Sequence, residues 1–375
     1  MPALYIHIPF CKSRCIYCGF YSTTREELRS RYVDALCREM ELRRGYVSGD
    51  INTVYLGGGT PSQLSADELQ RLFSYIYKVY SVDPGAEVTI ECNPDDITPS
   101  YASLLQSLPV NRVSMGAQTF SDERLRFLHR RHNAQEVSRA VEILRKAGIG
   151  NISVDLMFGF PDETLSMWQS DIDSAVALGV EHISAYSLMY EEGTPLYKML
   201  ESGRVKETEE EQSLAMYNEL IDRLSAAGYE HYEISNFAKP GYRSRHNSSY
   251  WRHVPYIGLG AAAHSYDLTS RQWNVADVKA YIDSICSGTV NAEREELDMN
   301  TRYNDTVMTS LRTAEGISLD ELESMFGSDC LNYCLAQSRR YIADGLLENS
   351  PHTLRLTRRG LFVSDMIMSD LMIVD

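Results

Sequence analysis

Three cysteines near the start of the chain have the type and spacing of a metal site. Three residues separate Cys11 from Cys15, and two separate Cys15 from Cys18. Structural zinc normally takes four protein ligands, whereas a 4Fe-4S cubane held by three thiolates leaves one iron open to a non-protein ligand. The count of three therefore favours an iron–sulfur cluster. The alternatives are a zinc site completed by His7 or Cys37, or three loop thiols that bind no metal.

A glycine-rich segment is a second candidate for ligand contact. Gly57, Gly58 and Gly59 are followed by Thr60 and Pro61. Because glycine has no Cβ, the backbone amides of this segment could approach a ligand closely. A tight turn would use the same residues, and their types alone leave both explanations open.

Four polar residues further along the chain could belong to the same site. Glu91 ends an otherwise apolar run, where an unpaired buried carboxylate is costly, so we expect it to meet a donor or a cation. A salt bridge would satisfy it equally well. The guanidinium of Arg130 suits a carboxylate, although a solvated charge at a helix end is the alternative. Gln118 and Asp155 are weak candidates when each is taken alone.

These candidates need elements that bring them together. From residue 4 to about residue 188, β-rich runs alternate with stretches of helical period, the pattern of βα units around a parallel sheet. Loops at the carboxyl ends of parallel strands are where such folds assemble their sites, and the candidates lie there. The predicted strands are residues 4–8, 53–56, 87–91, 112–115, 152–157 and 182–187. The predicted helices are residues 26–44, 66–77, 100–107, 134–147 and 165–177.

The rest of the chain predicts a second, smaller unit. Residues 229–263 are rich in Tyr, His, Asn and Gly and have poor periodicity, so we interpret them as a loop-rich joint. From about residue 300, helical runs lead to a short strand at 353–357. We therefore divide the chain into residues 1–237 and residues 238–375, and the second part ends in a small α+β domain similar to a winged helix.

Composition limits the classes of function. The net charge of −16 argues against broad nucleic-acid binding, which needs clustered Lys and Arg, and favours a small-molecule or protein partner. The cysteine cluster begins at residue 11, which leaves no room for a secretory signal. No stretch approaches the roughly 18 apolar residues of a spanning helix, so any membrane association would be peripheral. Eight cysteines are too sparse for a disulfide scaffold and indicate a reducing, cytoplasmic compartment.

The cysteine spacing, with Tyr17 just before the third cysteine, resembles the signature of the radical SAM superfamily. The run Leu-Tyr-Ile-His-Ile-Pro-Phe-Cys at residues 4–11 is similar to one branch, the oxygen-independent coproporphyrinogen III oxidase family with its HemW-like haem chaperones, and this resemblance covers nearly the whole chain. It implies an α/β fold built on a partial (β/α)6 barrel. The open iron would chelate the amino and carboxylate groups of S-adenosylmethionine (SAM) and pass one electron to its sulfonium, generating a 5′-deoxyadenosyl radical. The residues implied around SAM are Tyr5, Tyr17, Gly58, Gly59, Thr60, Glu91, Gln118, Arg130 and Asp155.

Two departures and one motif distinguish the branches of this family. The coproporphyrinogen III dehydrogenases carry a further cysteine two residues past the third cluster ligand, where this chain has Phe20. They also place a substantial segment before the first strand, which here begins at about Leu4. The motif His246-Asn-Ser-Ser-Tyr250-Trp251 is similar to one of the HemW-like proteins, which bind haem and deliver it to haemoproteins. We expect a haem chaperone; the alternative is a dehydrogenase that decarboxylates porphyrinogen propionates.

The same motif makes His246 a candidate haem contact. Imidazole is a natural axial ligand of haem iron, and Tyr and Trp offer flat apolar surface. A hydrogen-bonded structural histidine is the alternative for His246. The resemblance implies haem as cargo and recipients among respiratory haemoproteins, and it leaves open whether SAM is cleaved.

Overall fold

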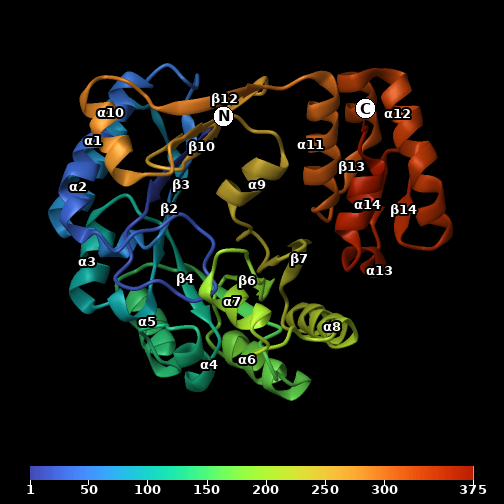
Figure 1. The fold of residues 1–375 in the computed structure, drawn as a ribbon, viewed down its shortest axis with the longest axis horizontal. Helices are drawn as coiled ribbons and strands as arrows, with labels where there is room; N and C mark the ends of the chain where they lie inside the picture. Colours follow the sequence, from blue (N-terminus) through green and yellow to red (C-terminus); the bar gives the residue numbers. More distant parts are fainter. Residues whose placement is uncertain (375) are drawn as a thin grey trace.

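A parallel sheet organises most of the molecule. The computed structural model describes residues 1–374. Its main sheet has twelve strands in the order β12-β11-β10-β9-β1-β2-β3-β4-β5-β6-β8-β7. The six predicted βα units are confirmed, and they supply six neighbouring parallel strands that Figure 1 shows end-on. These strands are β1 (Ala3–Ile8), β2 (Ile51–Gly58), β3 (Val82–Cys92), β4 (Arg112–Gln118), β5 (Asn151–Phe158) and β6 (His182–Ser187).

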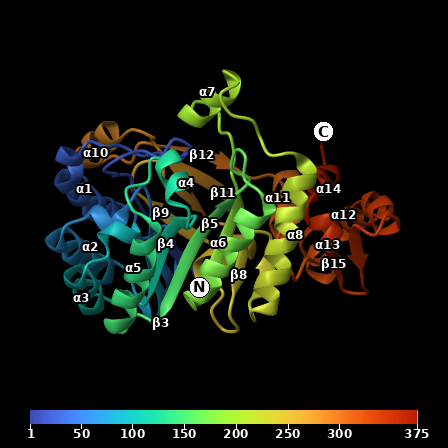
Figure 2. The ribbon, with the colours of Figure 1, turned by 90° about the horizontal axis from the view of Figure 1, so that it is seen from below.

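Helices cover the outer face of these strands, and Figure 2 shows α5 and α6 packed outside β4 and β5. Their amphipathic sequences bury one side against the sheet, as α2 does at i, i+3, i+4 and i+7 with Leu69, Leu72, Phe73 and Ile76. Capping boxes start two of them at Ser65 and Asn133. Across residues 1–374, no helix is both long and apolar enough to cross a bilayer. The helices of this part are α1 (Arg29–Leu42), α2 (Ala66–Val79), α3 (Pro99–Ser107), α4 (Asp122–Phe127), α5 (Ala134–Lys146), α6 (Leu165–Ala177), α7 (Pro195–Glu201) and α8 (Glu210–Ala226).

Later segments extend the sheet at both edges. β9 pairs in parallel with β1, and β10, β11 and β12 follow it in antiparallel order. β8 and β7 continue the opposite edge beyond β6. The elements that follow α8 are β7 (Glu230–Glu233), β8 (Asn236–Ala238), α9 (Arg245–Trp251), β9 (Tyr256–Leu259), β10 (His264–Tyr266), β11 (Ser270–Asn274), α10 (Val278–Cys286) and β12 (Ala292–Glu296).

This arrangement differs from the expected joint. The boundary predicted after residue 237 falls inside the main sheet, and residues 229–263 form three strands and α9. These strands have three or four residues each, too few for a period of two to show in the sequence. The main hydrophobic core accordingly extends to Ile285 of α10.

A second hydrophobic core lies in the C-terminal domain, which Figure 1 shows beside the barrel. Its antiparallel sheet has the order β13-β15-β14. α12 contains a break at Gly327, where φ is 83°, so the order of elements is helix, strand, two helices and two strands, as in a winged helix. The predicted fold class is confirmed. The elements are α11 (Met299–Leu311), β13 (Ile317–Ser318), α12 (Leu319–Ala343), β14 (Leu347–Asn349), β15 (Thr353–Leu356), α13 (Arg358–Leu361) and α14 (Ser364–Leu371).

Candidate functional site

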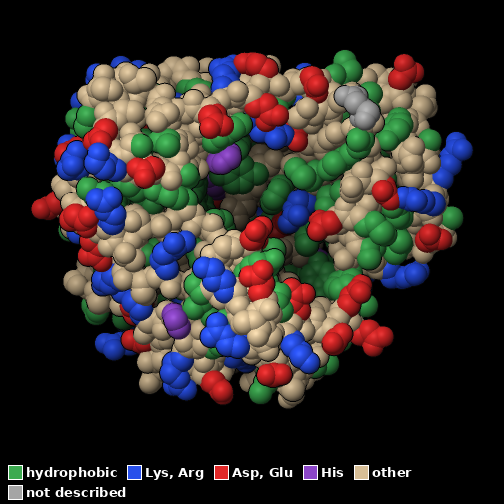
Figure 3. Space-filling view, in the orientation of Figure 1, with side chains coloured by type: hydrophobic (Ala, Val, Ile, Leu, Met, Phe, Trp, Pro, Cys, Tyr) green, Lys and Arg blue, Asp and Glu red, His purple; other side chains and the backbone are tan. Residues whose placement is uncertain are grey.

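A cavity of about 640 Å³ opens among the carboxyl ends of the barrel strands. The space-filling view is hollowed near its centre, between the barrel and the C-terminal domain (Figure 3). Of the residues predicted to form the site, Tyr5 and His246 do not line this cavity. Those that line it are Cys11, Cys15, Tyr17, Cys18, Gly58, Gly59, Thr60, Glu91, Gln118, Arg130 and Asp155.

The three cysteines lie on the loop that follows β1, and each is a half-buried free thiol. The Thr60 hydroxyl donates to Cys11 Sγ at 3.3 Å, and Arg130 Nη1 donates to Cys15 Sγ at 3.6 Å. Burial raises the pKa of the Cys11 and Cys18 thiols. A bound metal would offset that burial by stabilising the thiolates, and the two donors are already placed to hydrogen-bond them.

The two fourth ligands of the zinc alternative, His7 and Cys37, have other partners in the structure. Within residues 1–374, no group of three or more His, Cys, Asp or Glu is placed to hold one ion. A cubane distributes its thiolates over different iron atoms, so its ligands need not converge on one point. The fourth ligands of the zinc alternative are engaged elsewhere: His7 hydrogen-bonds the Tyr5 hydroxyl and the Tyr21 carbonyl at 3.0 Å each, and Cys37 is buried in the core.

Gly58 and Gly59 bring the end of β2 directly against β1. A Cβ on Gly58, where φ is 109°, would lie 2.4 Å from the imidazole carbon Cε1 of His7. A Cβ on Gly59 would lie 2.7 Å from the carbonyl carbon of Pro9. Because that neighbour is backbone and cannot rotate away, only glycine fits at position 59.

The carboxylate of Glu91 is held from two sides. Its Oε1 accepts from the Tyr55 hydroxyl at 2.7 Å, and its Oε2 accepts from the Gly58 amide at 3.0 Å. Burial raises the pKa of Glu91 to about 7, and these two hydrogen bonds oppose the rise. Within the described residues no cation lies within 4.0 Å of it, so hydrogen bonds take the place of the alternative salt bridge.

Arg130 is an interior residue of the site. Its Nη2 donates to Asn93 Oδ1 at 2.8 Å and to the Gly116 carbonyl at 2.6 Å. Its Nε is buried and has no partner among the described atoms. Its neighbour Arg131 pairs instead with Asp95 and Asp96, at 2.9 and 3.1 Å.

Asp155 and Gln118 lie on the two strands next to Arg130. Burial raises the pKa of Asp155 to about 6, against the effects of the Ser184 hydroxyl and of Arg112. Gln118 ends β4 beside a β-bulge, with φ at 68°. A Cβ on Gly116 would lie 2.6 Å from Gln118 Nε2, so the glycine makes room for that amide.

Several lining residues were missed by sequence reasoning, among them Tyr55, Arg112, Ser114 and Ser184. They occupy the strand positions that face the barrel interior, where apolar side chains are usual. A signal exists in the sequence, because Arg112, Ser114 and Gln118 recur at even spacing along β4.

Tyr5 and His246 lie deeper in the barrel. The Tyr5 ring stacks on Tyr55 with centroids 6.2 Å apart. His246 is 1% exposed, with Nδ1 at 2.7 Å from the Thr53 hydroxyl and Nε2 at 2.9 Å from the Tyr250 hydroxyl. Burial lowers the pKa of its imidazole to about 3. Both ring nitrogens therefore have partners, as a structural histidine would.

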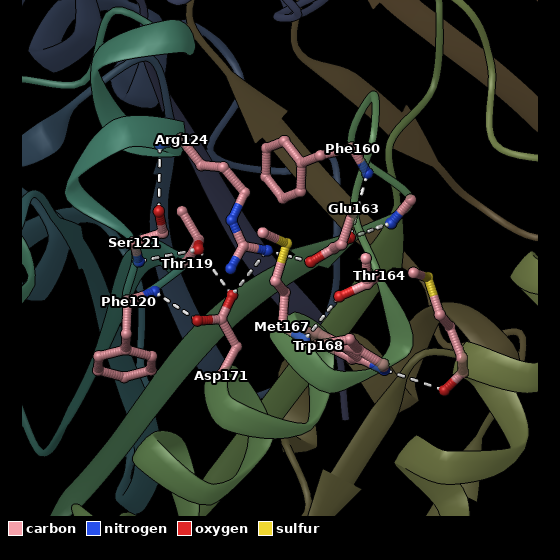
Figure 4. Close-up of polar contacts among 12 residues, drawn as sticks. Thr119, Phe120, Ser121, Arg124, Phe160, Glu163, Thr164, Met167, Trp168 and Asp171 are labelled. Atoms are coloured by element: carbon pink, nitrogen blue, oxygen red, sulfur yellow. Dashed lines mark hydrogen bonds and ion pairs between the residues drawn. The ribbon is translucent and has the colours of Figure 1, made fainter.

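A buried ionic cluster ties together the loops that follow β4 and β5. Arg124 on α4 lies between Glu163 and Asp171, and the Asp171 carboxylate accepts from the Thr119 hydroxyl at 2.6 Å (Figure 4). Glu163 also accepts from the Gly159 amide at 2.7 Å. Because Thr119 directly follows Gln118, the cluster fixes the backbone next to the cavity.

The chain was compared with known proteins. Residues 5–175 match the Radical SAM superfamily model, and residues 297–363 match the HemN C-terminal domain model. The heme chaperone HemW of Bacillus subtilis is 35% identical over 365 residues, which is 96% of each chain. The heme chaperone HemW of Escherichia coli is 36% identical over 266 residues, 70% of this chain and 69% of the relative.

The fold has a solved counterpart. Coproporphyrinogen III oxidase (HemN) from Escherichia coli, a radical SAM enzyme, superposes with a TM-score of 0.86 over 99% of this chain and 90% of that one. At 22% sequence identity this likeness shows a shared fold. The family matches and the two relatives identify the family: the chain belongs to the radical SAM superfamily and, within it, to the HemW family.

Proposed function

We propose that this protein is a haem chaperone that carries a 4Fe-4S cluster and SAM and delivers haem to haemoproteins, among them respiratory ones. The observation that carries the proposal is the gathering of three free thiols, a glycine turn, two half-buried carboxyls and a half-buried arginine around one cavity. Membership of the superfamily implies the cluster and SAM, and the relatives named heme chaperone HemW point to haem as the cargo. We place the protein in the cytoplasm, with at most peripheral membrane contact.

The proposed cluster ligands are Cys11, Cys15 and Cys18. When bound, the cluster and SAM together supply one-electron chemistry at the sulfonium. Thr60 and Arg130 hydrogen-bond the thiolates, which orients them and lowers the cost of their charge. In this proposal Arg130, with its free buried Nε, also pairs the SAM carboxylate.

The remaining proposed SAM residues present acceptors and donors to the same cavity. Glu91 and Asp155 are half-buried carboxyls on the cavity lining, able to accept from the ammonium and hydroxyl groups of SAM. Gln118 supplies an amide, Gly58 and Gly59 allow close approach, and Tyr17 lines the pocket as an aromatic wall. Tyr5 lies behind the pocket and packs against Tyr55, which lines it. These residues would bind and orient SAM whether or not it is cleaved.

The mouth of the cavity suits a flat apolar cargo. Phe20 and Met189 line it with exposed fractions of 72% and 63%. Exposed apolar side chains gathered at one opening indicate a binding surface. Arg14 on the same lining could receive a propionate of haem.

An anaerobic haem titration of the cluster-reconstituted protein, followed by absorbance, tests the proposal. We expect uptake near one haem per chain, with iron and sulfide in the protein and a chromophore lost in air. A Cys11→Ala/Cys15→Ala/Cys18→Ala variant serves as the cluster-free control. Zinc without sulfide would overturn the cluster assignment. Failure to take up haem, together with turnover of coproporphyrinogen III in the presence of SAM and a reductant, would replace the chaperone by the dehydrogenase.

A further inference from the structure

We infer that His246 is a positioning residue of the SAM pocket, which holds Tyr55 and through it Glu91, and that it does not ligate haem iron. The inference rests on the proposed function, because it takes Glu91 as a SAM contact. It gives His246 a structural role inside the barrel. From the sequence alone, the same residue was a candidate haem ligand.

The first step is the contact between two rings. The His246 imidazole stacks on the Tyr55 ring with centroids 4.8 Å apart and planes 25° apart. Tyr5 packs beside both rings, with its centroid 6.2 Å from that of Tyr55 and 6.4 Å from that of His246. The hydroxyl of Tyr55 donates to Glu91 at 2.7 Å, so the plane of the Tyr55 ring decides where that carboxylate is held.

The second step is that His246 is itself fixed. Both of its ring nitrogens bond hydroxyls, Thr53 at 2.7 Å and Tyr250 at 2.9 Å, and its backbone amide donates to Glu87 at 2.9 Å. An imidazole that ligates iron must give up one of these ring bonds and leave a buried hydroxyl without its partner. At 1% exposure, His246 also has no surface on which a porphyrin could lie.

The third step is the anchorage of α9, which carries His246. Arg245 at its start donates to the Gly85 carbonyl at 2.7 Å, and Tyr250 packs edge-on against Tyr256 of β9 with centroids 4.8 Å apart. At its end, Trp251 lies under the guanidinium of Arg312, 5.1 Å from the ring centroid. α9 thus joins the barrel interior to the C-terminal domain, and Figure 1 shows it between the two.

The barrel contains a matched second network that serves as a control. His182 bonds the Ser153 hydroxyl and the Tyr232 hydroxyl at 2.7 Å each and is fully buried, like His246. Its ring contacts Tyr232, which does not line the cavity. Replacing His182 removes a comparable buried hydrogen-bonded ring without touching Tyr55.

The experiment compares SAM affinity and haem uptake for the full-length, cluster-loaded protein and its variants. We expect His246→Ala to weaken SAM binding by about tenfold in calorimetric titration, a change equivalent to ~1.4 kcal/mol. His246→Phe keeps the ring and restores most of the affinity. His182→Ala leaves the affinity within about twofold of wild type, although both alanine variants lower the unfolding midpoint. All of these variants keep stoichiometric haem uptake.

A double-mutant cycle with Tyr55→Phe tests the route. If His246 acts by orienting the Tyr55 hydroxyl, His246→Ala adds little to the loss already caused by Tyr55→Phe. Independent, multiplying effects would overturn the inference, as would unchanged SAM affinity in His246→Ala. Loss of the haem spectrum in both His246 variants would assign the iron ligand to His246 instead. If the wild-type protein bound no SAM, that result would contradict the proposed function itself, not only the role of His246.

Discussion

Glu91 and Asp155 are half-buried carboxyls of the cavity whose pKa values are raised towards the physiological range. Burial raises the pKa of Glu91 from its ordinary 4.5 to about 7 and that of Asp155 from 3.8 to about 6. A protonated Glu91 loses its charge and much of its strength as an acceptor. Because the folded chain binds these protons more tightly than the unfolded chain, the stability contribution of Glu91 declines as pH rises from about 4.5 to about 7.

The pKa of Glu91 predicts a pH-dependent affinity for SAM. Between about pH 8 and about pH 6 the ionised fraction of Glu91 falls roughly tenfold, so SAM binding should weaken by up to that factor. Glu91→Gln should bind SAM weakly at about pH 8 and lose this slope. Calorimetric titrations at three pH values measure both effects, and an equal slope in the variant would assign the titration to another group, with Asp155→Asn the next variant to test.

The close approach at Gly59 predicts a large effect from one added methyl group. Gly59→Ala would place a Cβ against the Pro9 backbone, and overpacking of this kind typically costs about 1–3 kcal/mol. We expect a lower unfolding midpoint and weaker SAM binding. Gly45→Ala is the matched control, because nothing lies within 4 Å of its Cβ. Thermal unfolding of both variants tests this prediction. Equal unfolding midpoints would contradict it, because they would show that the backbone near Pro9 makes room for the added methyl group at no cost in stability.

At the scale of elements, the ionic cluster of Arg124, Glu163 and Asp171 holds α4 to α6 (Figure 4). Arg124→Met would leave two buried carboxylates without a cation, which typically costs about 3–5 kcal/mol. Burial raises the pKa of Glu163 to about 7 and also raises that of Asp171, so the cost should shrink as pH falls towards about 5 and Glu163 takes up its proton. Urea unfolding at about pH 8 and about pH 5 measures this difference, with the exposed Arg126→Met on the same helix as control.

The strands and helices of the first half could be predicted because their patterns are local. The predicted helix at 66–77 is α2 (Ala66–Val79), and the predicted strand at 152–157 is β5 (Asn151–Phe158). By contrast, the pairing of β9 with β1 joins Ala3 to Tyr256, a contact that no local pattern records. Strand β12 reads Ala-Glu-Arg-Glu-Glu and is mostly exposed, so hydrophobic periodicity gives it no signal.

Among the residues of the cavity, too, some could be predicted from local sequence and others could not. Residues that belong to motifs, such as Cys11 and Gly58, could be proposed from their neighbours in the sequence. Tyr55 and Arg112 belong to no motif and reach the cavity only because alternate positions of β2 and β4 face inward. His246 does belong to a motif, yet its burial and its hydroxyl partners depend on the position of α9 in the folded chain.

At the scale of the whole molecule, Leu361 and Phe362 of the C-terminal domain pack against the main core, and ion pairs such as Arg243–Glu315 and Arg358–Asp222 join the same two parts. A β-bridge pairs Glu233 of β7 with Thr313 of the C-terminal domain, and the Ile234 amide beside it donates to the Arg312 carbonyl at 3.0 Å. The guanidinium of Arg312 covers Trp251 and faces the buried Glu233, where it opposes the rise in that carboxyl's pKa. One side chain therefore contacts α9 and stabilises β7.

This interface predicts that Arg312→Ala loosens the two domains without unfolding either core. Loss of a desolvated cation over an indole costs about 2 kcal/mol, and Glu233 loses the charge that favours its ionised form. Hydrogen exchange should quicken in residues 230–238 and 245–251 and stay slow in the core of α12. Arg339→Ala is the control, because that side chain is exposed on α12. Equal exchange in the two variants would mean that the other contacts between the two parts hold them without Arg312, and would contradict the prediction.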